Sequence, residues 1–135
     1  MSLTLKQAQA AVEAAHQKAL DMGLKMNIAV VDAGANLIAF ARMEGAWLGS
    51  IDIAIKKAKT ARYFDMPTGE LGKLSQPGEP LYGIEVTNQG LVSFPGGEII
   101  LDENKQVIGA IGASGSTVDD DEKVAQAGKK AVERS

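Results

Sequence analysis

The chain has 135 residues, of which 45% are hydrophobic and 23% are charged, and its formal net charge is −3. These values predict one folded domain over residues 1–135 and argue against a disordered chain. The negative charge argues against a nucleic-acid partner, and no apolar run is long enough to span a membrane. The polar N-terminal sequence and the absence of cysteine lead us to expect a cytoplasmic protein.

The first forty residues carry signals for one helix and a pair of strands. Thr4 is a suitable N-cap, good helix formers follow it, and Gly23 closes the predicted helix. The runs MNIAVVD (26–32) and NLIAFAR (36–42) are typical of strands. Ala33-Gly34-Ala35 between them predicts a hairpin.

A second helix is expected in the middle of the chain. Ser50 is the predicted N-cap, and apolar residues at helical spacing follow over residues 51–64. Pro67 ends this helix, and Thr68 is expected to cap a short helical turn. Residues 75–90 are rich in proline and glycine, and their pattern assigns no element.

The last third of the chain predicts more strands and a final helix. Residues 91–94, 98–102 and 106–114 read as two or three strands, and residues 117–134 are expected to form a helix with acids first and bases last. The acids at 119–121 are interpreted as partners of the helix dipole. The whole pattern predicts an α+β fold with helices packed on an antiparallel sheet.

The stretch RMEGAWLGS (42–50) links the second strand to the second helix, and it has two interpretations. It is either an ordinary connection with solvated charges or the wall of a site into which Arg42 and Glu44 project. Trp47 within it either caps the core or anchors an interface between subunits.

Four motifs, taken in order, resemble the GlcG/HbpS-like haem-degrading family, which includes the C-terminal domain of PduO-type proteins. They are AVVDAGANLIAFARMEGA (29–46), SIDIAIKKAKTA (50–61), FPGGE (94–98) and VIGAIGASGSTVDDDEKVAQAG (107–128). The resemblance implies a profilin-like fold, with a five-stranded antiparallel sheet flanked by helices. It also implies a homo-oligomer.

The same resemblance implies haem as the ligand, with degradation in some relatives. His16, the only histidine of the chain, is then the expected axial ligand to the iron. Arg42 is expected to pair with a propionate, with Glu44 beside it at the same strand end. Gly96 and Gly97 are expected to let the backbone approach the macrocycle, or else only to form a turn.

Two further interpretations stay open at this point. His16 at the edge of a helix stripe can be an ordinary packing or surface residue. The protein can then be a non-catalytic module that holds a small organic acid through Arg42, or that serves assembly, as an accessory to glycolate or diol metabolism. The sequence leaves open whether the protein is an enzyme.

Overall fold

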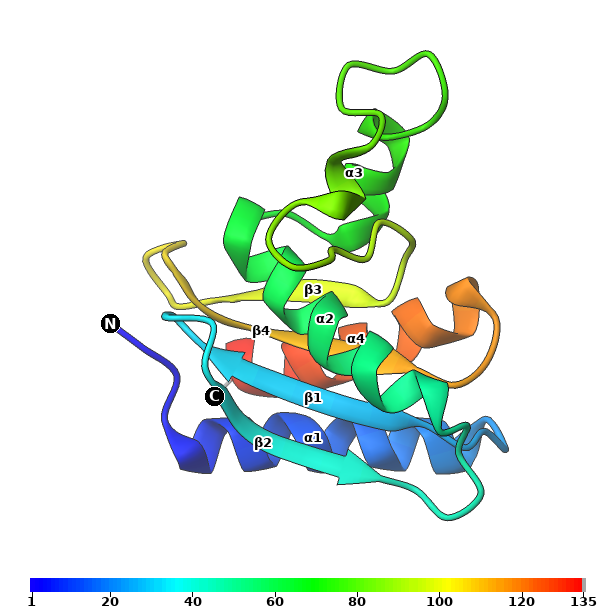
Figure 1. Cartoon of the computed structure of the whole chain (residues 1–135). Coiled ribbons are helices and arrows are strands. Elements are labelled where there is room, and N and C mark those ends of the chain that lie inside the picture. Colours follow the sequence, from blue (N-terminus) through cyan, green and yellow to red (C-terminus); the bar gives the residue numbers. More distant parts are fainter. Residues whose placement is uncertain (135) are drawn as a thin grey trace.

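The computed structural model describes residues 1–134 as one sheet with helices on both faces (Figure 1). No helix in this described part is long and apolar enough to cross a membrane. In chain order the elements are α1 (Leu5–Asp21), β1 (Asn27–Asp32), β2 (Leu37–Arg42), α2 (Gly49–Phe64), α3 (Thr68–Leu74), the 3-10 turn η1 (Ile84–Val86), β3 (Gly97–Leu101), β4 (Val107–Ser114) and α4 (Val118–Glu133).

The four antiparallel strands are ordered β2-β1-β4-β3, so β2 and β3 are the two edges of the sheet. The predicted hairpin and the α+β class are confirmed. The prediction of five strands is wrong for the described residues, because residues 91–94 form no strand. Leu91 N–H donates to the Glu85 carbonyl (2.9 Å) and Val92 N–H to the Thr60 hydroxyl (3.2 Å). These donors are therefore not available for a strand ladder.

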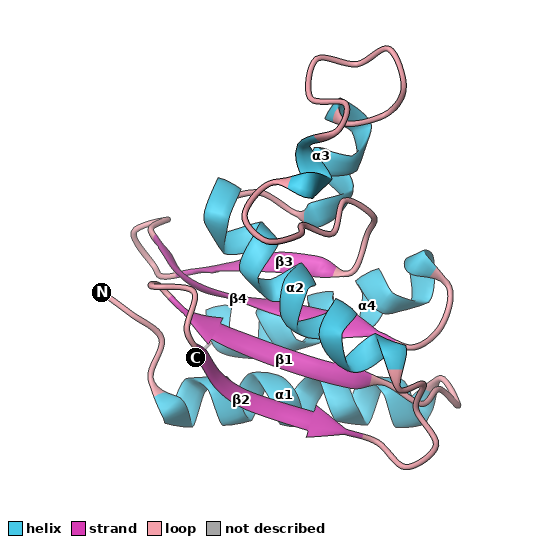
Figure 2. Ribbon diagram, viewed as in Figure 1, coloured by secondary structure: helices cyan, strands magenta, loops and turns pink. Residues whose placement is uncertain are grey.

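Two helices cover one face of the sheet and one covers the other (Figure 2). On the first face α1 and α4 pack against side chains from β1 and β4, and on the second face α2 packs through an alanine stripe. Small residues bring the layers close together. A Cβ at Gly128 would lie only 2.8 Å from the Ala11 carbonyl oxygen, and a Cβ at Gly112 would collide with the Ala54 carbonyl oxygen. The residues of the α2 stripe are Ala54, Ala58 and Ala61, packed against Ala29, Val31 and Ala110.

The helix ends agree with the predictions in one case and differ in two. Thr4 caps α1 with a full capping box, in which Gln7 N–H donates to the Thr4 hydroxyl (3.1 Å). The cap prediction for Ser50 is wrong, since α2 begins one residue earlier and the buried Ser50 hydroxyl accepts a hydrogen bond from Ser114 (3.1 Å). Thr68 lies inside α3, and its hydroxyl accepts from Gly97 N–H (2.9 Å).

Candidate functional site: a groove beside the edge strand

A surface groove of about 380 Å³ runs between α1 and the edge strand β2. It follows from the fold, because β2 has no strand on its outer side and α1 lies along it (Figure 1). Its wall is formed by five apolar residues together with Gln9, Glu13 and His16, and we call it the His16 groove. Its lining residues are Leu5, Gln9, Val12, Glu13, His16, Ile38, Ala39 and Phe40.

His16 is exposed on α1, one turn after Val12 and on the same side of the helix. Within the described residues, neither of its ring nitrogens takes part in a hydrogen bond or an ion pair. A neutral imidazole with a free nitrogen is a good ligand for a transition metal. The groove therefore presents one unused metal ligand on an apolar wall.

Arg42 and Glu44 are exposed at and just beyond the end of β2, and neither lines the groove. Side chains alternate along a strand, so Arg42 is on the same side of β2 as Phe40, which packs against the α2 cluster on the face opposite α1. In the described structure Arg42 has no ion-pair partner. A ligand that overhangs the edge of the sheet next to Phe40 would meet this guanidinium.

Gly96 and Gly97 lie at the other edge of the sheet, at the start of β3. Three strand spacings separate the edges, about 14 Å. Both glycines are buried against α2. A Cβ at Gly96 would collide with the Lys57 ammonium, and a Cβ at Gly97 would lie 2.6 Å from the Lys57 carbonyl oxygen. The structure thus does not bring the two glycines together with His16, and it gives them a packing function.

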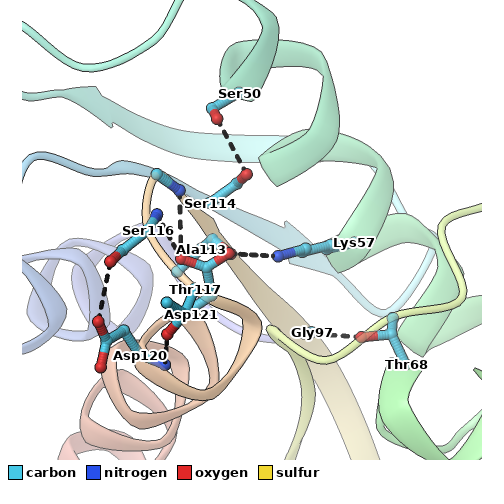
Figure 3. Close-up of polar contacts among 11 residues, drawn as sticks. Ser50, Lys57, Thr68, Gly97, Ala113, Ser114, Ser116, Thr117, Asp120 and Asp121 are labelled. Carbon is cyan, nitrogen blue, oxygen red and sulfur yellow. Dashed lines mark hydrogen bonds and ion pairs between the residues drawn. The ribbon is translucent and has the colours of Figure 1, made fainter.

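A buried ion pair between α2 and α4, which the sequence did not predict, lies near the β3 edge of the sheet (Figure 3). Lys57 is fully buried, and its ammonium donates to Asp121 Oδ2 (2.9 Å) and to the Ala113 carbonyl (2.9 Å). The other oxygen of Asp121 accepts the N–H groups of Gly115 (3.2 Å) and Ser116 (2.9 Å). Burial lowers the pKa of Lys57 and raises the pKa of Asp121, and the hydrogen bond between them opposes both shifts. Asp121 therefore does more than offset the helix dipole.

A second buried acid lies between β3 and α4. Glu98 is only 6% exposed and faces Glu122, one of whose carboxyl oxygens is buried without a hydrogen-bond partner. Burial, the hydrogen bond with Glu122 and its negative charge raise the pKa of Glu98 to about 9, against the attraction of Lys129. The folded structure thus favours the protonated form of Glu98 over its carboxylate.

Signals for both buried groups were present in the sequence. Lys57 falls within the alanine stripe of α2, between Ala54 and Ala61 at helical spacing. Glu98 alternates with Ile100, which belongs to the core. A charged residue at a core position indicates a buried partner, but nothing in the local pattern says where that partner lies.

In its described residues the protein is a small α+β domain that presents an imidazole without a hydrogen-bond partner in a groove beside an edge strand. A family model described as "Haem degrading protein HbpS-like" matches residues 3–130. The chain belongs to this HbpS-like family, which confirms the resemblance noted in the sequence.

Relatives of known sequence agree with that membership. The chain is 38% identical over 125 residues to a 15.0 kDa protein encoded between dhaT and dhaS in Citrobacter freundii, covering 93% of this chain and 88% of the relative. It is 34% identical over 132 residues to the corrinoid adenosyltransferase PduO of the same organism. That match covers 98% of this chain but only 39% of PduO.

Solved structures show the same fold. The Klebsiella pneumoniae protein ORFY superposes with a TM-score of 0.93 at 37% identity, covering 96% of this chain and 90% of ORFY. A complex of PduOC with haem superposes with a TM-score of 0.91 at 34% identity, covering 97% of this chain and 95% of that one. The latter relative is thus a haem-binding protein.

Proposed function

We propose that this protein binds haem in the His16 groove, with His16 as the axial ligand of the iron. The observation that carries the proposal is the exposed imidazole of His16, which has no partner in the described structure and lies on an apolar wall. Membership of the HbpS-like family and the haem complex of PduOC support it.

The residues around His16 fit a haem group. Leu5, Val12 and Ile38 offer apolar surface for the macrocycle, and the groove is open to solvent on its outer side. We propose that Arg42, which lies on the face of β2 opposite His16, pairs with a propionate that reaches over the edge of the sheet. A haem bound here would supply an iron for one-electron and O₂ chemistry, and His16 would hold that iron in the groove. We assign no part in this binding to Gly96 and Gly97.

The test is a titration of the purified protein with haemin, followed by the Soret band. We expect a saturable, stoichiometric shift that is lost in His16→Ala and restored when free imidazole is added to that variant. Lys18→Ala is the matched control, since Lys18 is exposed on the same helix and does not line the groove. Unchanged haem binding by His16→Ala would show that the iron is bound elsewhere.

Haem degradation is a separate proposal that needs its own measurement. Glu13 is the one carboxylate that lines the groove, and it lies one turn before His16. We expect the loaded protein to lose its Soret band under ascorbate and oxygen faster than His16→Ala incubated with the same haemin. A Soret band that stays stable for hours in the wild type would show a protein that binds haem without turning it over.

A further inference from the structure

A second groove, of about 500 Å³, lies at the opposite end of the β1–β4 ladder from the β1–β2 hairpin, where three loops meet. We call it the Trp47 groove. It is separate from the His16 groove, since the two share no lining residue. It contains the tryptophan of RMEGAWLGS, whose side chain is 65% exposed and so does not cap the core. Its walls include Lys25, Gly45, Trp47, Gly115, Ser116 and Thr117.

Two glycines make room for Lys25 in this groove. A Cβ at Gly45, which has φ +81°, would lie 3.1 Å from Lys25 Cδ and 3.2 Å from its Nζ. A Cβ at Gly115 would collide with the Lys25 carbonyl oxygen. Lys25 has no ion-pair partner within the described residues. The groove thus has an unpaired ammonium packed against a glycine next to an exposed indole.

The walls around Lys25 are held by partly buried hydrogen bonds. The side-chain amide of the buried Asn27 donates to the Trp47 carbonyl (3.1 Å) and holds the loop that carries the indole. On the facing wall, Ser116 N–H donates to Asp121 (2.9 Å) and the Ser116 hydroxyl to Asp120 (2.8 Å) (Figure 3). A rigid site loses less entropy when it binds a ligand than a mobile one does.

We propose that the Trp47 groove binds a small planar monocarboxylate, with its carboxylate on Lys25 and its flat part against Trp47. An ammonium recognises an anion, and an indole face recognises a flat apolar group. Asp119 and Asp120 in the first turn of α4 disfavour a dianion such as phosphate at the Thr117 end of the groove. This proposal does not depend on haem binding.

Trp47 is the only tryptophan of the chain, so its fluorescence and its single indole N–H resonance report on this groove alone. The probe is sodium benzoate, titrated against the full chain, with benzamide as the uncharged isostere and inorganic phosphate as the dianion. We expect a saturable shift of the indole resonance with benzoate at millimolar concentration. With benzamide and phosphate we expect binding weaker by at least about tenfold.

Two variants separate this site from the haem site. Lys25→Met should weaken benzoate binding by about tenfold, while Lys123→Met, an exposed lysine on α4 outside the groove, should leave it unchanged. His16→Ala should bind benzoate like the wild type even where it no longer binds haemin. The proposal would be overturned if benzoate caused no shift of the indole resonance, or caused the same shift in Lys25→Met as in the wild type.

Discussion

The two edges of the sheet differ in how they use polar residues. Along β2 the polar groups are exposed and have few partners, as His16 and Arg42 illustrate. On the β3 side they are buried and bonded, as in the pair of Lys57 with Asp121 and in Glu98. Within the described residues, the strongest pKa shifts belong to Lys57, Asp121 and Glu98 on the β3 side, and none of these three residues lines the His16 groove or the Trp47 groove.

This difference helps to distinguish titratable residues that belong to a functional site from those that only stabilise the fold. A shifted pKa often marks a functional site, but buried structural networks produce the same shifts. Here the imidazole of His16, which has no hydrogen-bond partner in the described structure, is the better functional candidate, and the buried groups belong to the packing of α2 and α4 on the sheet. The predictions below test that division, starting with the largest effect.

Replacing Lys57 by methionine should cost the most stability. Met fills a similar volume, but it leaves the buried Asp121 carboxylate without its cation, a loss of about 3–5 kcal/mol in the free energy of unfolding. Lys56→Met is the matched control, because it breaks only the exposed pair with Asp52 (3.2 Å) and should cost less than about 0.5 kcal/mol. Urea denaturation of both variants measures the difference.

The double variant Lys57→Met/Asp121→Asn should recover part of that loss. The amide has no charge to leave unpaired, and its oxygen can still accept from Gly115 and Ser116. Equal stability of Lys57→Met and Lys56→Met would contradict a structural role for the buried pair.

The substitution Gly97→Ala should destabilise the fold without changing the affinity for haem. A Cβ there would meet the Lys57 carbonyl oxygen and Thr68 Cγ2, both at 2.6 Å, so α2 must move at a cost of about 2 kcal/mol. Gly49→Ala is the control, since a Cβ at Gly49 meets nothing within 4 Å. Thermal unfolding and a haemin titration are run on both variants. A loss of haem affinity in folded Gly97→Ala would show that this glycine is part of the haem site.

The neutral carboxyl of Glu98 predicts a dependence of stability on pH. Its pKa is about 9 in the folded chain against an ordinary 4.5, so its contribution is complete below pH 4.5 and is lost as the pH rises toward 9. Glu98→Gln should match the wild type near pH 5 and exceed it by about 1–2 kcal/mol at pH 9. The figure is below the full linkage value because water can enter around the ionised group.

Denaturation of Glu98→Gln across that range checks the sign. Glu79→Gln, at an exposed position, should show no pH-dependent difference from the wild type. A Glu98→Gln variant whose advantage shrinks with rising pH would mean that Glu98 is ionised in the folded chain.

Structural elements that depend only on residues close in sequence could be predicted from the sequence. The capping box at Thr4, the Gly34 hairpin and the acid-first helix at the C-terminus all depend on neighbours within a few residues, and all are present. The Ser50 cap failed because a tertiary partner, Ser114, took the hydroxyl. A strand at 91–94 failed for a similar reason, since its N–H groups bond to a loop and to α2.

The candidate site was harder to predict because it depends on strand order. The family resemblance assigns His16 and Arg42 to one site with Gly96 and Gly97, but β1 and β4 separate the β2 edge, beside which His16 and Arg42 lie, from the β3 edge that carries the glycines. The partner of Lys57 is 64 residues away in sequence, and no periodicity along one helix can indicate such a contact. Conversely, the apolar wall of the His16 groove needed both α1 and β2 to be placed side by side.

The smallest expected effect concerns the charges at the end of β2. If a propionate reaches over the edge strand, Arg42→Gln should raise the haemin Kd about threefold, about 0.7 kcal/mol for an exposed ion pair. Glu44→Gln is the matched control two residues on, and removing its negative charge should leave the Kd unchanged or lower it slightly. The Arg42 effect should also fade in high salt, because an exposed pair is screened. An Arg42→Gln variant with wild-type affinity at low salt would show that the propionates point away from this end of the strand, toward α1.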